Sequence, residues 1–194
     1  MHRITPFLVA SALALVPIPA FAHPAVNGVH DLLHGFYHPL GGIDHVLAMV
    51  AVGVLAAQLG GRALWLVPAA FVGVMAAAGV AGMAGLAIPY VEVGIALSLI
   101  VLGAVIALQI SMPLAAAMAL VGFFAIFHGH AHGTEMPATA SGALYGLGFV
   151  SATALLHLVG IAMGIALLRL TNGRRVAQVA GSIAAVAGAA LLIG

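Results

Sequence analysis

Two clusters of histidine and acidic residues contain the side chains of this sequence that are best suited to chemistry. The first cluster spans residues 30–45 and the second spans residues 128–135. Imidazole and carboxylate donors suit Ni²⁺, Co²⁺, Zn²⁺ or Cu²⁺, whereas Mg²⁺ and Ca²⁺ prefer oxygen donors alone. The chain has no cysteine, so thiolate ligands and cysteine nucleophiles are excluded. The clusters therefore predict a site for a divalent transition metal, with these candidate ligands: His30, His34, His38, Asp44, His45, His128, His130, His132 and Glu135.

The first two histidines of the first cluster have helical spacing. His30 and His34 are four residues apart, so on a helix they share a face and could hold one ion. An amphipathic helix at the membrane surface with two solvated histidines explains the same spacing. Both interpretations remain open at this point.

A proline and two glycines separate His38 from the pair Asp44-His45. These residues, at positions 39, 41 and 42, interrupt any helix, so His38 can fold back over the pair at the membrane edge. Asp44 could instead act only as an N-cap of the helix that follows. Because an ionisable pair at this depth is costly, we expect a functional role for both residues.

The second cluster places three histidines at alternating positions before Glu135. On a helix His128 and His132 share a face and His130 points away, whereas in an extended chain all three point the same way. The flanking glycines allow irregular backbone, which is tolerated at membrane depth only where it is buried in protein or lines a cavity. A polar loop with histidines placed by chance is the alternative without a metal.

Three further residues could contribute to the same site or path. Glu92 lies near the start of an apolar stretch, and His157 lies near the middle of another, where an isolated imidazole is costly unless it is hydrogen-bonded or beside water. A histidine that only packs in the core is the alternative for His157. His23 would become the first residue after signal cleavage and could chelate through its amine and ring, although chance placement there also fits.

The composition is that of an integral membrane protein. Hydrophobic residues make up 64% of the 194 residues and charged residues only 5%, and the mean hydropathy is +1.27. Such a chain is not an ordinary soluble domain. Its five basic residues, all arginine, are too few to form a surface that binds nucleic acid.

Residues 1–22 have the pattern of a cleavable signal peptide. A short basic start precedes a mostly apolar stretch, and Ala20-Phe21-Ala22 fits the small-x-small cleavage pattern. Cleavage after Ala22 would leave residues 23–194 as the mature chain. An uncleaved first span is the alternative, and the prolines at positions 6, 17 and 19 count against it.

The rest of the chain predicts six spanning helices. A spanning helix needs about 20 mostly apolar residues, and the connections between the apolar stretches are very short, so we expect one compact all-α bundle of antiparallel neighbours over residues 23–194. Its outer metal-binding segment would cover about residues 23–45. The predicted spans are Gly42–Leu59, Ala63–Met83, Tyr90–Gln109, Pro113–Phe127 with an extension into the second cluster, Gly142–Leu168 and Val176–Ile193.

The distribution of arginine predicts the orientation of this bundle. With the mature N-terminus outside, Arg62 and the arginines at positions 169, 174 and 175 all lie inside, as the positive-inside rule requires. The same orientation puts the four acidic residues and most of the histidines on the outer side. Acidic residues contribute little to orientation, so a shared ligand explains their common location better.

The two clusters resemble the motifs of the HupE/UreJ family of bacterial nickel permeases, which occur with hydrogenase and urease genes. The matching motifs are the His-x5-Asp-His pattern that ends at His45 and the stretch from Phe127 to Glu135. The resemblance covers essentially the whole chain. It implies that nickel is the metal, that His130 occupies a variable position, that Glu92 matches an acidic position of the family, and that the family's metal-binding residues correspond to His38, Asp44, His45, His128, His132 and Glu135.

The sequence thus predicts a secondary permease of the bacterial inner membrane that imports Ni²⁺, with Co²⁺ as a second possible cargo. Its metal cluster would face the periplasm, and the metal would serve the maturation of enzymes such as hydrogenase or urease. We expect no enzymatic activity and no prosthetic group. The expected partners are the metal ion and the lipid bilayer, with no ATPase partner, and the sequence specifies no oligomeric state.

A zinc-dependent membrane hydrolase is the alternative from another functional class. Three of the same residues would hold Zn²⁺ and an acid such as Glu135 would activate water. The sequence lacks the His-Glu-x-x-His pattern of common zinc proteases and any separate substrate-binding element.

Overall fold

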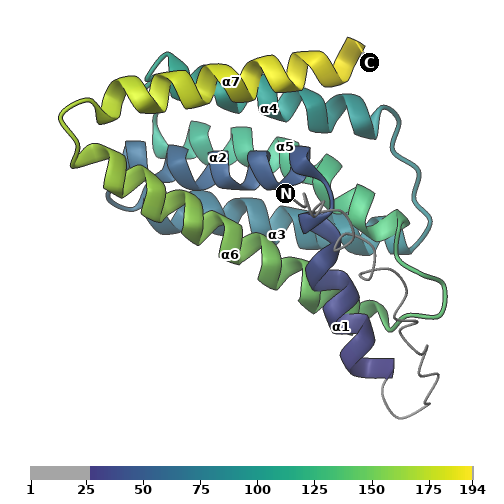
Figure 1. Ribbon diagram of the computed structural model, residues 1–194. Coiled ribbons are helices and arrows are strands. Elements are labelled where there is room, and N and C mark those ends of the chain that lie inside the picture. The colour runs from purple at the N-terminus through teal and green to yellow at the C-terminus, as the bar shows by residue number, and fades with distance from the viewer. Residues whose placement is uncertain (1–26, 194) are drawn as a thin grey trace, which may run out of the picture.

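The computed structural model describes residues 27–193, and within that range the chain is entirely helical, without a strand (Figure 1). The predicted signal peptide and His23 lie outside the described residues. The elements, in chain order, are α1 (Asn27–Tyr37), the short 3-10 helix η1 (His38–Leu40), α2 (Ile43–Leu59), α3 (Ala63–Met83), α4 (Val91–Ala107), α5 (Leu114–Thr134), α6 (Gly142–Leu168) and α7 (Gly173–Ile193).

The helices agree with the apolar stretches of the sequence. Helices α3 and α6 have the predicted bounds, and α2, α4 and α7 differ from theirs by one to three residues. The predicted extension of the fourth span is confirmed, because α5 continues through the second cluster to Thr134. Apolar runs form helices here because a helix satisfies its own backbone hydrogen bonds, which lipid cannot do.

Not every helix has the length of a membrane span. Four helices, α3, α5, α6 and α7, are long and apolar enough to cross a membrane, and the pair formed by α1–η1 and α2, bent by 81°, adds at most one more. Helix α4 has 17 residues, about 26 Å at 1.5 Å per residue, against roughly 30 Å of hydrocarbon. The predicted count of six spans therefore stays a prediction.

The helices pack in pairs at very short distances. Helix α3 runs along α5, α2 along α6, and α4 along α7, while α1 lies across the first part of α6 (Figure 1). Glycines face one another where α2 meets α6, at Gly53 and Gly160, and where α4 meets α7, at Gly103 and Gly181. A Cβ atom on any of these glycines would overlap the backbone of the facing helix. Close packing of small residues is the usual means of helix association in lipid.

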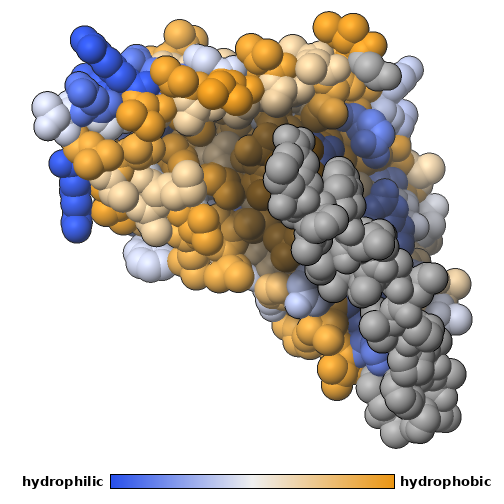
Figure 2. Space-filling view, viewed as in Figure 1, coloured by the Kyte–Doolittle hydropathy of each residue, from blue (hydrophilic) through white to orange (hydrophobic). Residues whose placement is uncertain are grey.

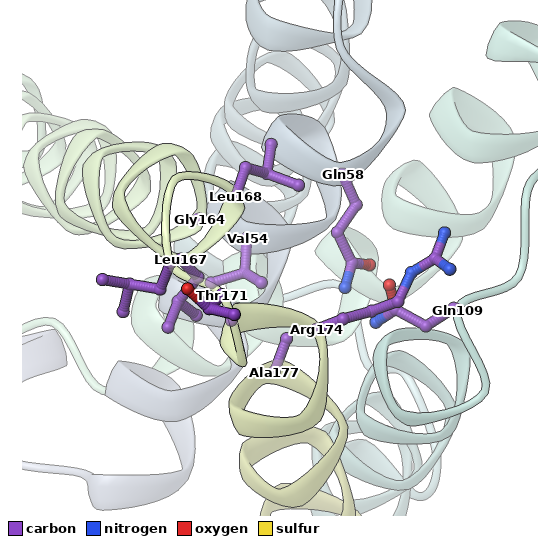
Figure 3. Close-up of a pocket in the computed structure, with 11 residues that line it drawn as sticks. Val54, Gln58, Gln109, Gly164, Leu167, Leu168, Thr171, Arg174 and Ala177 are labelled. Atoms are coloured by element: carbon purple, nitrogen blue, oxygen red, sulfur yellow. The ribbon is translucent and has the colours of Figure 1, made fainter.

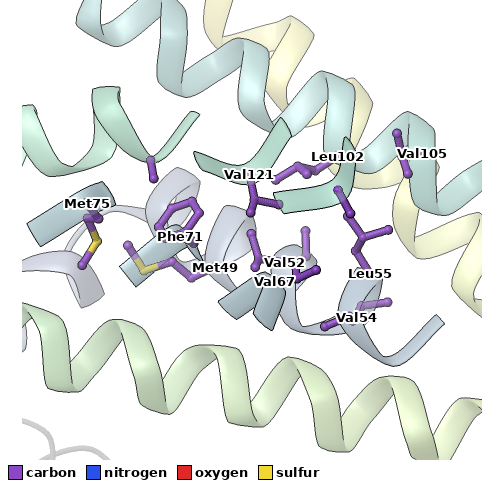
Figure 4. Close-up of a cluster of buried hydrophobic side chains, with 14 of the residues drawn as sticks. Met49, Val52, Val54, Leu55, Val67, Phe71, Met75, Leu102, Val105 and Val121 are labelled. Carbon is purple, nitrogen blue, oxygen red and sulfur yellow. The ribbon is translucent and has the colours of Figure 1, made fainter. Parts of the chain in front are cut away.

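The core lies between the two ends of the bundle. Phe71 and Met75 of α3 meet Met49 of α2, Leu102 of α4 and Val121 of α5 in one buried cluster (Figure 4). Met49 and Met75 are fully buried, so both belong to the core. This apolar layer separates two ends of different character.

The polar residues lie mainly at the two ends of the helices, with hydrophobic surface between them (Figure 2). Arg62 lies at the turn between α2 and α3, and the other described arginines lie at the turn between α6 and α7. Asp44 begins α2, Glu92 begins α4 and Glu135 ends α5, at the opposite end. Arginine and acidic residues are therefore segregated to opposite ends, as the topology argument requires.

We predict that the contact between α2 and α6 makes Gly53 intolerant of even one methyl group. Alanine is favoured over glycine in a helix by roughly 1 kcal/mol, so Gly73→Ala, at a helical position with open space around it, should leave the melting temperature of the detergent-purified protein unchanged or higher. Gly53→Ala should lower it, because overpacking typically costs about 1–3 kcal/mol. Equal melting temperatures for the two variants would contradict this packing.

Candidate metal site

The first part of the site is formed where the chain bends between α1 and α2. Pro39 and the Gly41-Gly42 step end η1 before α2 begins, and the chain turns by 81° there. The bend brings His38 to the end of α5, where His38 Nε2 lies 2.7 Å from Glu135 Oε2. The side chain of His38 is 22% exposed and that of Glu135 is 56% exposed, so this pair forms the accessible mouth of the site.

The first turn of α2 holds Asp44 and His45 in a fixed relation. The Asp44 carboxylate accepts hydrogen bonds through Oδ1 from the His45 backbone N–H at 2.8 Å and from His45 Nδ1 at 3.0 Å. Because Nδ1 then carries the proton, Nε2 of a neutral ring is free to act as a ligand, as in carboxylate–histidine–metal arrangements. His45 Nε2 is buried and has no hydrogen-bond partner. A Cβ atom at Gly42 would lie 2.7 Å from Asp44 Oδ1, so this arrangement requires glycine there.

Helix α5 contributes two histidines on one face. His128 Nε2 lies 3.0 Å from Ser98 Oγ, and the Ser98 hydroxyl donates its own proton to the Ile95 carbonyl at 2.6 Å. The serine oxygen must therefore accept from His128 Nε2–H, which leaves His128 Nδ1 without a proton in the neutral ring. His128 Nδ1 and both ring nitrogens of His132 are buried without partners.

His130, the middle histidine of the second cluster, points away from the other two. His130 Nε2 donates to the Leu86 carbonyl, at 2.6 Å, in the connection between α3 and α4. The helical alternative for the second cluster is therefore confirmed, and the extended alternative, with all three histidines on one side, is wrong. An α-helix turns by about 100° per residue, so the middle residue of an i, i+2, i+4 set points away from the other two.

The histidine rings form a continuous line into the bundle. Ring centroids are 5.2 Å apart between His38 and His132, 4.8 Å between His132 and His45, and 4.9 Å between His45 and His128. Phe71 continues the line, at 5.6 Å from His128 and 5.1 Å from His157. Among the residues that the structure describes, no three histidine, aspartate or glutamate side chains are arranged to hold an ion at one point. The donors lie in succession and do not converge.

The remaining predicted residues lie outside the line or at its edge. His34 lies beside the line, 6.2 Å from the His38 ring and 5.8 Å from the Tyr145 ring. Both His34 and His30, one turn earlier on α1, are exposed. Glu92 is exposed in the first turn of α4. His157 is 1% exposed, and both of its ring nitrogens lack partners. His157 is therefore deep in the bundle, as the sequence predicts.

Three residues that support the line were not identified from the sequence. Ser98 fixes the ring of His128, Phe149 stacks on His132 at 5.4 Å, and the buried Tyr145 lies 5.8 Å from His38. Ser98 is the one hydroxyl residue in α4, which is a usable signal. Phe149 and Tyr145 carry no such signal, because their roles depend on how α6 packs against η1 and on the stacking of Phe149 on His132.

Comparison with known proteins gives a match over nearly the whole chain. Residues 11–191 match the family model described as HupE / UreJ protein. The chain is 48% identical over 189 residues to Protein HupE of Rhizobium leguminosarum bv. viciae, covering 96% of this chain and 97% of that protein. No solved structure matches the chain.

The line of rings predicts that His132 and His130 contribute differently to metal binding, although they are two residues apart. In Ni²⁺ and Co²⁺ titrations of the purified protein, His132→Ala should weaken binding about tenfold or more. Loss of a residue that only supports a metal ligand already costs that much, and loss of a ligand should cost at least the same. His130→Ala should retain the wild-type affinity, because the His130 ring is directed to Leu86. Equal losses in the two variants would contradict the assignment.

Proposed function

This chain belongs to the HupE/UreJ family, and from that premise we propose that it is a secondary permease that imports Ni²⁺, or Co²⁺, across the bacterial inner membrane. The cargo would supply the maturation of nickel enzymes such as hydrogenase or urease. Family membership favours transport of nickel or cobalt, and the nitrogen and oxygen donors of the line suit either ion.

The observation that carries this proposal is the set of buried ring nitrogens without partners. His45 Nε2, His128 Nδ1 and both nitrogens of His132 lie in the bundle without hydrogen bonds. Buried polar atoms are nearly always paired, and leaving one unpaired costs roughly 1–3 kcal/mol. A cation that binds these nitrogens would satisfy them, and only imidazole in its neutral form can bind it.

Capture begins at the accessible pair of His38 and Glu135. The ion displaces their mutual hydrogen bond, loses part of its water shell and then binds His132, whose ring lies next in the line. From there it reaches the nitrogens of His45 and His128. Glu135 and Asp44 supply the negative charge that offsets part of the double charge of the ion.

Phe71 separates this outer line from His157. The Phe71 side chain is fully buried and its ring lies between the rings of His128 and His157. In the proposed path the Phe71 ring would move aside as the ion passes from His128 to His157. The two free nitrogens of His157 then provide a second station, deeper in the membrane.

The distribution of donors favours transport over hydrolysis. A catalytic zinc site holds its ion with three protein ligands and keeps one position open, and no such set of three is present among residues 27–193. Conduction instead requires several sites that bind the ion weakly enough for it to leave. Donors that lie in succession meet that requirement.

In the proposed orientation the histidine line opens to the periplasm and the arginine end faces the cytoplasm, in accord with the positive-inside rule. Residues 1–22 would be removed as a signal peptide, and residues 23–194 would form one domain of six spans. The short helices α2 and α4 are partly enclosed by neighbouring helices and would cross with little tilt. The membrane potential, about 2.3 kcal/mol per elementary charge per 100 mV, would drive the ion inward without an ATPase partner.

The decisive experiment measures uptake of radiolabelled nickel, at submicromolar concentration, by bacteria that lack their own nickel importers and express this chain. Wild type should accumulate nickel, and Asp44→Ala and His45→Ala should not, because His45 loses its orientation or its donor. His30→Ala, an exposed histidine outside the line, serves as the matched control and should retain uptake. Excess Co²⁺, Zn²⁺ or Cu²⁺ as competitor defines the preferred metal. If the membrane-inserted wild type accumulates no metal, the proposal fails.

A substitution at His157 should distinguish metal binding from metal transport. His157→Leu removes the inner station but leaves the outer donors in place, so the purified protein should bind Ni²⁺ or Co²⁺ at the outer donors with wild-type affinity. Cells should nevertheless show an uptake rate reduced about tenfold or more, which corresponds to a transport barrier higher by about 1.4 kcal/mol. A normal uptake rate would assign His157 to packing alone.

A further inference from the structure

A cavity with mixed apolar and polar lining lies at the end of the bundle opposite the histidine line. It lies between the ends of α2 and α4, the last turns of α6 and the start of α7, is partly open to the surface, and has a volume of about 180 Å³. One water needs only roughly 10–15 Å³ of such space, so a polyatomic group fits. The polar side chains that line it are Gln58, Gln109, Thr171 and Arg174 (Figure 3).

The free polar groups of this cavity include two strong donors. Gln58 Nε2 is buried and has no hydrogen-bond partner, and Arg174 extends its guanidinium group along the same side of the cavity as Gln58 (Figure 3). Gln109 is already engaged, because its Nε2 donates to the Ile106 carbonyl at 2.7 Å. A ligand in this cavity would therefore meet donors from Gln58, Arg174 and the Thr171 hydroxyl.

The charge at this end is positive and has no internal counter-charge. All four acidic residues of the chain lie at the other end, at positions 31, 44, 92 and 135, and both ion pairs of the described residues involve histidine rather than arginine. Helix α7, which has 21 residues, also directs its positive N-terminal end here, with Gly173 and Arg174 on the cavity wall. A bare divalent cation is repelled by such a site, whereas an anion is attracted.

We propose that this cavity binds a phosphate group, carried either by the headgroup of an anionic phospholipid or by free phosphate. Arginine binds phosphate oxygens through two parallel hydrogen bonds, and basic pockets between helices at the cytoplasmic side of a membrane suit anionic headgroups. Gln58 and the start of α7 complete the set of donors around the phosphate. The proposal does not depend on metal transport.

The neighbouring Arg175 provides a matched control. Both arginines are exposed, but only Arg174 is part of the cavity wall. Arg174→Gln and Arg175→Gln therefore remove the same charge from the same end of the protein. General attraction to anionic lipid therefore falls equally in the two variants. Only Arg174→Gln removes a donor from the cavity, and Gln58→Leu removes the other donor without a change in charge.

The test titrates the full chain, purified in detergent, with phosphatidylglycerol and follows bound lipid by native mass spectrometry. Arg174→Gln should bind the lipid at least about fivefold more weakly than Arg175→Gln, the scale of one charge-assisted hydrogen bond, and Gln58→Leu should also bind more weakly than wild type. Inorganic phosphate is titrated separately by calorimetry with lipid-free protein.

The outcomes are distinct. Lipid binding that depends on Arg174, with no binding of inorganic phosphate, supports the headgroup as the ligand. Binding of inorganic phosphate that Arg174→Gln weakens and Arg175→Gln does not supports free phosphate. Equal weakening of lipid binding by the two arginine substitutions would assign the effect to surface charge and overturn the proposal, as would a wild-type protein that binds neither probe.

Discussion

The hydrogen bond from the His45 ring to the Asp44 carboxylate determines how the rest of the site can work. It holds the proton on Nδ1 and leaves Nε2 free inside the bundle, between the rings of His128 and His132. It also depends on Gly42 in the bend before α2, because a Cβ atom there would push the Asp44 carboxylate out of its present position. Asp44 therefore acts by orienting a ligand as well as by supplying charge.

The close helix pairs keep these rings in register. Helix α5 approaches α3 so closely that a Cβ atom at Gly129 would overlap the backbone of Met75, and this fixes which face of α5 is turned inward. His128 and His132 then face α2, while His130 forms its hydrogen bond on the other side. The same small residues that let α2 and α6 meet at Gly53 and Gly160 leave no space for the helices to shift. The close helix contacts therefore fix the backbone positions from which the histidine side chains extend.

Much of this arrangement could be predicted from the sequence, because both the helices and the paired histidines follow local rules. Apolar runs bounded by glycine or arginine predicted the limits of α3 and α6. The helical one of the two interpretations of the second cluster separated His130 from its neighbours. Tertiary contacts could not be predicted in the same way. The role of Ser98 depends on α4 lying beside α5, and the position of Phe71 between His128 and His157 depends on the depth at which α3 packs. The sequence likewise did not indicate that Glu92 is exposed, and it left open whether His30 and His34 are solvated, as the structure shows them to be.

The even spacing of the rings has a kinetic consequence. Successive centroids from His38 to His128 are 5.2, 4.8 and 4.9 Å apart, and two nitrogens that bind one ion, each at about 2.1 Å, are at most about 4.2 Å apart. Small ring rotations therefore let an ion bind the next nitrogen before it releases the previous one. Ligand exchange between His38 and His128 on the proposed path is then associative, because the ion gains each new bond before it loses the old one.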